Sequence, residues 1–304
     1  MSLPAIDLVL PAVSRIIEEE VRLVGPTDRG ESRSTFFLVG DSGELVVKLV
    51  PDGPEVFSNQ LRLLRLVASL RAQGYPAPEY LGAGQADKAV FTVQRRVAGQ
   101  TLEPGPGLPP AQELFSAVVP DLLVAVELQA GAGDLVDPPW PEWLLTTIEQ
   151  GGDGYCLHET MFRRSDTAAL LGRLQDLARR NSASAPESRD IVHFDLNPAN
   201  VLHQEGRLSG VVDWNVPFTG ASQGDRGFDV ATMLFYSYDL EPTRELLWER
   251  ATDISGLSWT SVYLCHLVLR QVEWSRRHKP DSDEERRFLT IATRVLADCE
   301  RRGA

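Results

Sequence analysis

Hydrophobic and polar residues alternate over short runs in the first hundred residues. Alternation with a period of two is typical of a strand with one buried face. We predict strands over 21–24, 35–39, 45–50 and 89–94. The turn Asp41-Ser42-Gly43 joins the second and third strands into a hairpin. Helices are expected at 6–19 and 55–71, where hydrophobic residues recur at helical spacing.

Further along the chain the hydrophobic spacing becomes that of helices. Residues 111–130 and 166–181 fit this spacing, and so does the chain from Arg244 onward. The last region carries two stripes that we assign to the core: Trp259, Val262, His266 and Leu269, then Phe288, Ile291, Val295 and Cys299. Strands followed by helices predict an α+β fold.

One strand signal interrupts the helical part of the chain. The hydrophobic runs 201–202 and 208–212 flank Gln204-Glu205-Gly206, which predicts a second hairpin. A Pro- and Gly-rich stretch at 103–110 predicts a loop close to the boundary between the two parts.

Composition limits the class of protein. With 304 residues and 43% hydrophobic content, the chain is long enough for a full core and two lobes. Its longest hydrophobic run, 115–130, contains Asp121 and Glu127, so we expect no membrane span. The first residues lack the pattern of a secretory signal. Three scattered cysteines without metal-ligand spacing predict a reducing, cytoplasmic location.

Charge narrows the choice of partners and draws attention to one lysine. The net charge of −13 argues against nucleic acid and favours cationic ligands. The chain has three lysines, and alternation places Lys48 on one strand face with Val46 and Val50. Lys48 is either an edge charge that prevents aggregation or a point charge for nucleotide phosphates. The motif described next favours the second interpretation.

Polar residues gather in His193-Phe194-Asp195-Leu196-Asn197-Pro198-Ala199-Asn200, and Asp213 follows. Pro198 keeps the residue before it out of helical geometry, so this segment is expected to be a loop. Phosphoryl transfer needs a carboxylate as proton acceptor and hard oxygen ligands for a magnesium ion on the nucleotide phosphates. Asp195 fits the base, and Asn200 with Asp213 fits the metal ligands. Taken singly, each of these residues could simply stabilise a turn. Together, in this order and spacing, they favour a catalytic role.

These residues, together with Gly224-Asp225-Arg226-Gly227-Phe228-Asp229-Val230-Ala231, resemble the signature of the aminoglycoside phosphotransferase and choline kinase-like family. The resemblance implies a bilobal, protein-kinase-like fold. It would have an N-terminal antiparallel sheet lobe that binds nucleotide (1–97) and a larger, mostly helical C-terminal lobe for catalysis and acceptor binding (98–304). Asp213-Trp214 replaces the D-F-G of protein kinases and no A-P-E segment follows, which points to a small-molecule acceptor.

The resemblance also implies roles for single residues. Lys48 would hold the α- and β-phosphates of ATP or GTP, and His193 and Asp229 would support the catalytic loop from within. From the sequence alone, Asp229 also fits an N-cap for a helix that begins near Val230. Leu128-Gln129 departs from the family pattern, in which many relatives show Leu-His.

A loop over the phosphates is expected at 27–34. It holds a single glycine, and Glu31 would repel phosphate, so an exposed hairpin loop fits the segment equally well. The candidate donors in this loop are Gly30, Ser32 and Ser34.

Other nucleotide contacts are expected at the hinge between the lobes, where backbone groups would face an adenine edge. The candidates are Gln94, Arg95, Arg96 and Val97. Kinases fix the strand lysine with a glutamate from a helix. The only acid near the start of the helix at 55–71 is Glu55, so either Glu55 serves or a neutral partner holds Lys48.

Acidic side chains are the candidates for contact with a cationic acceptor: Glu159, Asp239, Glu241 and Glu273. Taken singly, each fits solvated surface charge better. We predict magnesium-dependent transfer of the γ-phosphate of ATP or GTP to a small-molecule hydroxyl, in an aminoglycoside-type antibiotic or, alternatively, in choline, homoserine or a sugar. The glycine-poor loop and missing helix glutamate leave a third hypothesis, a nucleotide-binding module without turnover. Monomer and homodimer both remain open.

Overall fold

The computed structural model describes residues 6–27, 34–105, 108, 110–133, 140–214 and 223–304. It divides into two compact units: Met1–Gln100 with Ser209–Ala221, and Thr101–Leu208 with Ser222–Ala304. The chain returns to the first unit after residue 208. Antiparallel strands dominate the first unit and helices the second, which confirms the α+β class.

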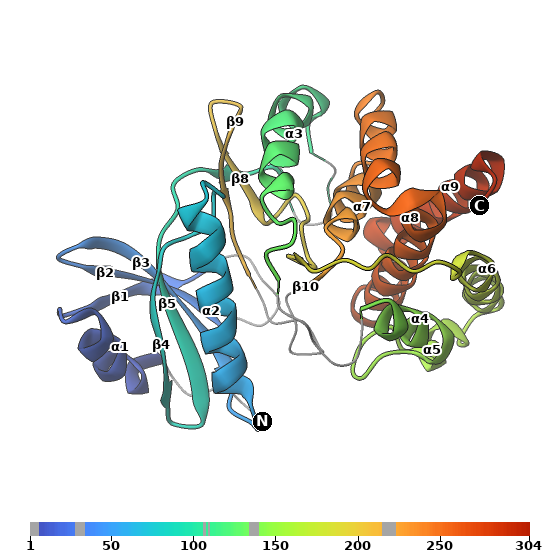
Figure 1. The fold of residues 1–304 in the computed structure, drawn as a ribbon. Coiled ribbons are helices and arrows are strands. Elements are labelled where there is room, and N and C mark those ends of the chain that lie inside the picture. Colours follow the sequence, from blue (N-terminus) through green and yellow to red (C-terminus); the bar gives the residue numbers. More distant parts are fainter. Residues whose placement is uncertain (1–5, 28–33, 106–107, 109, 134–139, 215–222) are drawn as a thin grey trace. The chain divides into compact units, whose positions relative to one another are not determined.

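Five antiparallel strands form the sheet of the first unit, in the order β1-β2-β3-β5-β4 (Figure 1). They are β1 (Arg22–Pro26), β2 (Thr35–Gly40), β3 (Gly43–Pro51), β4 (Tyr80–Ala86) and β5 (Ala89–Arg95). The alternating pattern predicts β1, β2, β3 and β5 to within two residues at each end.

The sequence pattern misses β4 because glycines interrupt its hydrophobic residues. Both glycines serve packing: a Cβ on Gly82 would lie 2.6 Å from Cγ2 of Ile16, and one on Gly84 would lie 2.6 Å from Cζ of Phe91. Glycine weakens a strand prediction, but here Gly82 and Gly84 allow neighbouring side chains to approach the strand closely.

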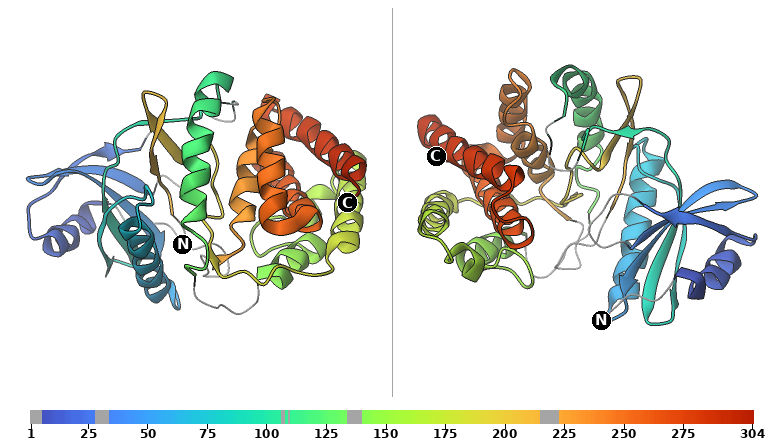
Figure 2. Two further views of the ribbon diagram at one scale, coloured as in Figure 1. Left: turned by 45° about the horizontal axis from the view of Figure 1, so that its top comes forward. Right: turned by 180° about the vertical axis from the view of Figure 1, so that it is seen from behind.

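Helices cover the sheet on both sides (Figures 1 and 2). The short 3-10 helix η1 (Ile6–Leu8) and α1 (Leu10–Ile17) pack on one face, and α2 (Val56–Ala72) lies on the other side. The core under α1 contains Leu45, Val47 and Leu49 of β3. Because side chains alternate along a strand, Lys48 belongs to the opposite face.

Helices form most of the second unit, and α8 runs beside α6, α7 and α9 (Figures 1 and 2). The helices are α3 (Gln112–Glu127), α4 (Trp140–Gln150), α5 (His158–Met161), α6 (Ser165–Asn181), α7 (Gly227–Tyr236), α8 (Thr243–His278) and α9 (Asp283–Arg302). Both predicted hydrophobic stripes, on α8 and α9, are buried, which confirms that they belong to the core. The pattern misses α4, in which Pro141 occupies the first turn, a position where proline is tolerated.

Short strands frame the segments that carry the candidate chemistry. They are β6 (Gln100–Thr101), β7 (Asp190–Ile191), β8 (Val201–Gln204), β9 (Arg207–Val211) and β10 (Gln223–Gly224). The predicted hairpin is confirmed as β8 and β9, with Glu205 and Gly206 at φ values of 51° and 78° in its turn. None of the described helices is long and apolar enough to cross a membrane.

Candidate active site

Asp229, in the first turn of α7, holds the loop that carries Asp195. Its Oδ2 accepts hydrogen bonds from the backbone N–H of His193 (2.7 Å) and from Nε2 of Gln129 (2.8 Å). Its Oδ1 accepts from the backbone N–H of Phe194 (2.9 Å). Phe194 has a φ of 70°, a left-handed conformation that is unfavourable for a residue with a side chain. The two backbone hydrogen bonds to Asp229 offset this strain.

The alternative of an N-cap role for Asp229 is wrong. The helix begins at Gly227 after the N-cap residue Arg226, which makes Asp229 its third residue, so the carboxylate serves the loop instead. Burial raises the pKa of the Asp229 carboxyl, while the electrostatic interaction with His193 and the hydrogen bonds from its N–H donors act in the opposite direction. Gln129, at the position that departs from the family pattern, donates one of these hydrogen bonds.

We expect Asp229→Ala to lower the free energy of unfolding by about 4 kcal/mol. The substitution leaves three buried N–H groups without their acceptor, and each unsatisfied donor costs about 1–3 kcal/mol. Urea unfolding followed by circular dichroism measures the loss. Asp239→Ala is the control, because this exposed aspartate pairs with arginines at the surface and should lose less than about 1 kcal/mol. Equal losses in the two variants would contradict the buried role.

Both carboxylate oxygens of Asp195 have partners within the second unit. Oδ1 accepts from Nη2 of Arg270 (3.0 Å), and Oδ2 accepts from Nδ2 of Asn200 (3.3 Å). The same Asn200 nitrogen donates to the backbone carbonyl of Asp195 (2.8 Å). The Asp195 side chain is still 26% exposed. An oriented carboxylate that remains open to solvent is suited to accept a proton from a hydroxyl group.

The rest of the loop supports this arrangement through backbone contacts. His193 is fully buried, and its Nδ1 accepts from the backbone N–H of Asp195 (3.3 Å), which links the two residues inside the loop. Asn197 accepts from the N–H of Ala199 at Oδ1 (2.9 Å), which closes a tight turn around Pro198. As predicted, the segment is a loop and not the start of a helix.

The first unit holds the second part of the candidate machinery. Nζ of Lys48, on β3, donates to Oδ1 of Asp213 at 2.5 Å. Asp213 lies just after β9 with a φ of 62°, and the next residue, Trp214, donates its Nε1 to the carbonyl of Val211 (3.1 Å) and packs edge-on against Tyr75. The anchored indole thus fixes the turn that presents Asp213 to the lysine.

Glu55 is the exposed N-cap residue of α2, with a φ of 63°. The sequence suggests either Glu55 or a neutral residue as the partner of Lys48. The ion pair described for Lys48 is with Asp213 instead. Of the three candidates in the loop over the phosphates, Gly30 and Ser32 lie outside the described residues. Ser34 is buried, and its carbonyl accepts from the N–H of Leu49 on β3 (2.7 Å).

The hinge candidates lie at and just after the end of β5. Gln94 pairs in register with Val46. The N–H groups of Arg95 and Arg96 donate to the carbonyls of Glu79 and Glu44 at 2.8 and 3.0 Å. These two backbone donors are therefore engaged within the sheet region. Their guanidinium groups contact the β2–β3 turn and Glu44.

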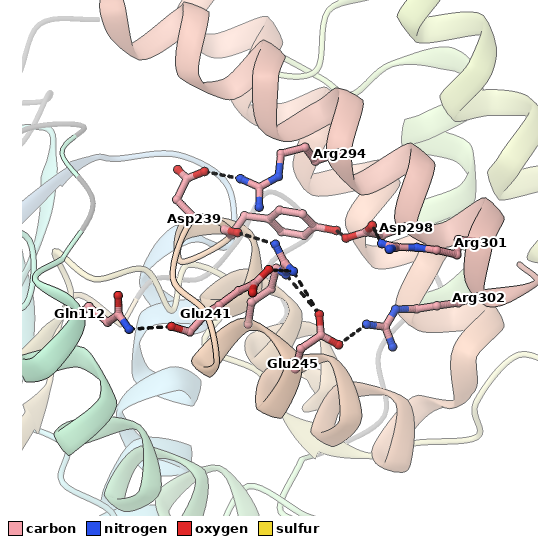
Figure 3. Close-up of polar contacts among 10 residues, drawn as sticks. Gln112, Asp239, Glu241, Glu245, Arg294, Asp298, Arg301 and Arg302 are labelled. Atoms are coloured by element: carbon pink, nitrogen blue, oxygen red, sulfur yellow. Dashed lines mark hydrogen bonds and ion pairs between the residues drawn. The ribbon is translucent and has the colours of Figure 1, made fainter.

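Two of the candidate acceptor contacts are bound by arginines near the α7–α8 connection (Figure 3). Asp239 pairs with Nη1 of Arg294 (2.5 Å) and Nε of Arg287 (3.3 Å), both from α9. Glu241 pairs with Arg244. The pairs of Asp239 join this connection to α9, whereas the Glu241 pair is local, and both neutralise charges that a cationic acceptor would need.

The remaining two acids differ in exposure. Glu273 is fully buried in α8 and pairs with Nε of Arg277 one turn later (3.1 Å). Burial raises the pKa of Glu273, and Arg277 opposes that shift. Glu159, in α5, is exposed.

His266 lies among aromatic rings beside Arg270. Its imidazole is fully buried, with Trp143, Phe194 and Phe228 at centroid distances of 5.8, 6.0 and 5.5 Å. Neither of its ring nitrogens has a hydrogen-bond partner among the described residues. Burial, followed by the charge of Arg270, lowers the pKa of His266 to about 3, so the ring is neutral at pH 7.

This depressed pKa predicts acid sensitivity. Below pH 6.5 the unfolded chain gains a proton at His266 that the folded state does not accept until about pH 3, so stability is lost as the pH falls through this window. Between pH 7 and pH 5 we expect a loss of about 2 kcal/mol from this group. His266→Phe should remove that contribution. Urea unfolding of both proteins at the two pH values tests this, and parallel losses would contradict it.

Sequence reasoning did not find Arg270, the cation that contacts Asp195. Arg270 is four residues after His266 on α8. An arginine one helical turn beyond a buried stripe is the sequence feature that could have indicated it.

Comparisons with known proteins agree with this geometry. Residues 24–265 match the model of the phosphotransferase enzyme family. The hygromycin-B 4-O-kinase of Escherichia coli is 26% identical over 255 residues, which cover 80% of this chain and 71% of that protein. The crystal structure of aminoglycoside phosphotransferase APH(4)-Ia has a TM-score of 0.69 at 21% identity, over 99% of this chain and 100% of that one. Macrolide 2'-phosphotransferase MphH from Brachybacterium faecium has a TM-score of 0.58 at 16% identity, over 94% and 98%.

The family match and the curated relative identify a small-molecule kinase, and the solved structures show that its fold is protein-kinase-like. The chain belongs to the phosphotransferase enzyme family. The predicted family resemblance and fold class are therefore confirmed.

Proposed function

We propose that the protein transfers the γ-phosphate of ATP or GTP, as its magnesium complex, to a hydroxyl group of an aminoglycoside-type antibiotic. The observation that carries this proposal is the Asp195 carboxylate, oriented at both oxygens in a chain that is similar to hygromycin-B 4-O-kinase over 80% of its length. Asp195 accepts the hydroxyl proton as the acceptor oxygen bonds to the γ-phosphorus. The bond to the β–γ bridging oxygen then breaks, and the nucleoside diphosphate leaves.

The donor atoms fit magnesium, which prefers hard oxygen ligands. In the second unit Nδ2 of Asn200 donates to Asp195, so the amide oxygen is the atom of Asn200 suited to a cation. In the first unit the Asp213 carboxylate would be the charged ligand. Magnesium, when bound, neutralises charge on the phosphate oxygens. Lys48 would then release Asp213 and bind the α- and β-phosphates, with Glu55 as its candidate partner in that state.

We assign the remaining nucleotide contacts to the hinge and to the phosphate loop. Since the N–H groups of Arg95 and Arg96 are engaged, the adenine edge would meet Val97 and the carbonyl groups of the hinge, with Gln94 beside them. Gly30, Ser32 and Ser34 are the proposed phosphate donors.

One observation favours a second candidate, a metabolic kinase of a neutral hydroxylated molecule such as a sugar. Asp239, Glu241 and Glu273 are each paired with an arginine, which leaves Glu159 as the acid of the four without an ion pair among the described residues. We propose Glu159 as the contact that a cationic acceptor would use. We place the reaction in the cytoplasm, without nucleic acid or membrane partners, in a monomer or homodimer.

A release assay for ADP over a panel of acceptors tests the proposal. The panel contains hygromycin B, other aminoglycosides, choline, homoserine and neutral sugars, each with magnesium and ATP. We expect an aminoglycoside to stimulate ADP release and expression of the gene to raise bacterial tolerance of that compound. Stimulation by sugars or amino alcohols alone would favour the metabolic kinase. Nucleotide binding without ADP release for any acceptor would favour the module without turnover.

A further inference from the structure

Arg270 reaches the catalytic loop from α8, 75 residues further along the chain than Asp195. We propose that Arg270 is the positioning residue that sets the orientation of the Asp195 base. The inference rests on the proposed function, because it assigns a role in the same phosphoryl transfer.

The contacts of Arg270 fix two adjacent loop residues at once. Nη2 donates to Oδ1 of Asp195 and Nη1 donates to the carbonyl of Phe194, both at 3.0 Å. The guanidinium also lies over the Phe194 ring, 4.7 Å from its centroid. Because the guanidinium is planar and rigid, these bonds couple the direction of the carboxylate to the backbone beside it.

Charge makes this arginine more than a packing residue. The segment from His193 to Asn200 contains neither lysine nor arginine, so its catalytic carboxylate takes a cation from α8. The Arg270 side chain is 17% exposed. Burial lowers its pKa and Asp195 raises it, with a net shift above the ordinary value, so the cation persists. The neighbouring His266 is neutral and does not compete for Asp195.

Arg270 and Asn200 hold different atoms of Asp195. Arg270 holds Oδ1, whereas Asn200 holds Oδ2 and the backbone carbonyl. Without Arg270 the carboxylate keeps its weaker contact of 3.3 Å and gains rotational freedom about χ2. A displacement of the reacting group by about 1 Å can lower the rate about 10²-fold, so loss of orientation should reduce turnover more than substrate binding.

The same helix supplies a matched control. Nη1 of Arg276 pairs with Oε1 of Glu285 on α9 at 2.6 Å; Glu285 is buried, and the Arg276 side chain is 11% exposed. This ion pair joins two helices and involves no residue of the catalytic loop. Arg276→Gln therefore reports what the loss of a largely buried arginine does to stability alone.

The experiment compares Arg270→Gln, Arg270→Lys and Arg276→Gln in the ADP-release assay, with the acceptor that the wild type uses. We expect Arg270→Gln to lower kcat about 30-fold and to leave KM for magnesium ATP within about twofold. Arg270→Lys should recover part of the loss, because it restores the charge but not both hydrogen bonds. Arg276→Gln should keep kcat within about twofold. In single-turnover measurements, Arg270→Gln should add less than about twofold to the defect of Asp195→Asn, since the orientation of a missing base has no effect.

Hydrogen exchange gives a readout that does not need turnover. Peptides covering 192–202 should exchange faster in Arg270→Gln than in the wild type, and in Arg276→Gln they should not. A kcat for Arg270→Gln equal to that of Arg276→Gln, or a loss that multiplies with Asp195→Asn, would overturn the proposal. If no acceptor supports turnover, the proposed function fails. In that case unchanged exchange over 192–202 in Arg270→Gln overturns the positioning role as well, and faster exchange there supports it.

Discussion

Asp195→Asn is expected to lower kcat about 10³-fold and to leave nucleotide affinity unchanged. The side chain accepts hydrogen bonds from Arg270 and Asn200, and asparagine keeps its size and one acceptor oxygen, so the loop should hold its shape. What the variant loses is the ability to take a proton from the attacking hydroxyl, a contribution of about 10²–10⁴ in rate for general base catalysis. Steady-state kinetics with isothermal titration of magnesium ATP separates the two effects.

Asp239→Asn is the control for this variant. It removes an acid from the same unit that pairs with Arg287 and Arg294 of α9 and whose side chain is 36% exposed. We expect its kcat to stay within about twofold of the wild type, because exposed ion pairs contribute little. A kcat for Asp195→Asn within about tenfold of the wild type would exclude Asp195 as the base.

Asp213→Asn is expected to cause a comparable loss of turnover by a different route. The substitution removes the charge of the proposed magnesium ligand and also the anionic partner of Lys48. The freed lysine still attracts phosphate, so binding of ATP without magnesium should stay equal or become tighter. The increase in affinity that magnesium gives the wild type should disappear, and kcat should fall about 10³-fold.

Lys48→Met separates the two roles in this ion pair. It leaves Asp213 available to the metal but removes the cation for the phosphates, so ATP binding should weaken both with and without magnesium. Isothermal titration of ATP into Asp213→Asn and into Lys48→Met, each with and without magnesium, measures these affinities. If Asp213→Asn kept a magnesium effect as large as that of the wild type, the assignment of Asp213 as a metal ligand would fail.

Local chemistry explains what the sequence could predict. Pro198 dictates a loop where Asp195 and Asn200 lie, and alternation along β3 turns Lys48 away from the core under α1. Both inferences need only the backbone preferences of neighbouring residues. For the same reason the strands of the five-stranded sheet are placed correctly except β4, in which Gly82 and Gly84 respond to packing against α1 and β5.

Contacts between distant parts of the chain explain what the sequence could not predict. Arg270 meets Asp195 across 75 positions, and helical periodicity identifies the buried face of α8 but not the polar group beside it. The arginine partners of Asp239 are hidden in the same way, so an acid with surface character joins the α7–α8 connection to α9. A charge pattern alone does not tell a ligand contact from an ion pair.

Phosphorus NMR of the complete reaction tests the central claim most directly. Wild-type protein is incubated with magnesium ATP and the acceptor panel, and the product is examined alongside the Asp195→Asn reaction. We predict a new phosphomonoester resonance on one acceptor, formed in equal amount to ADP and absent with Asp195→Asn. ADP formed together with inorganic phosphate, with no phosphomonoester on any acceptor, would contradict the claim that the protein phosphorylates a small-molecule hydroxyl.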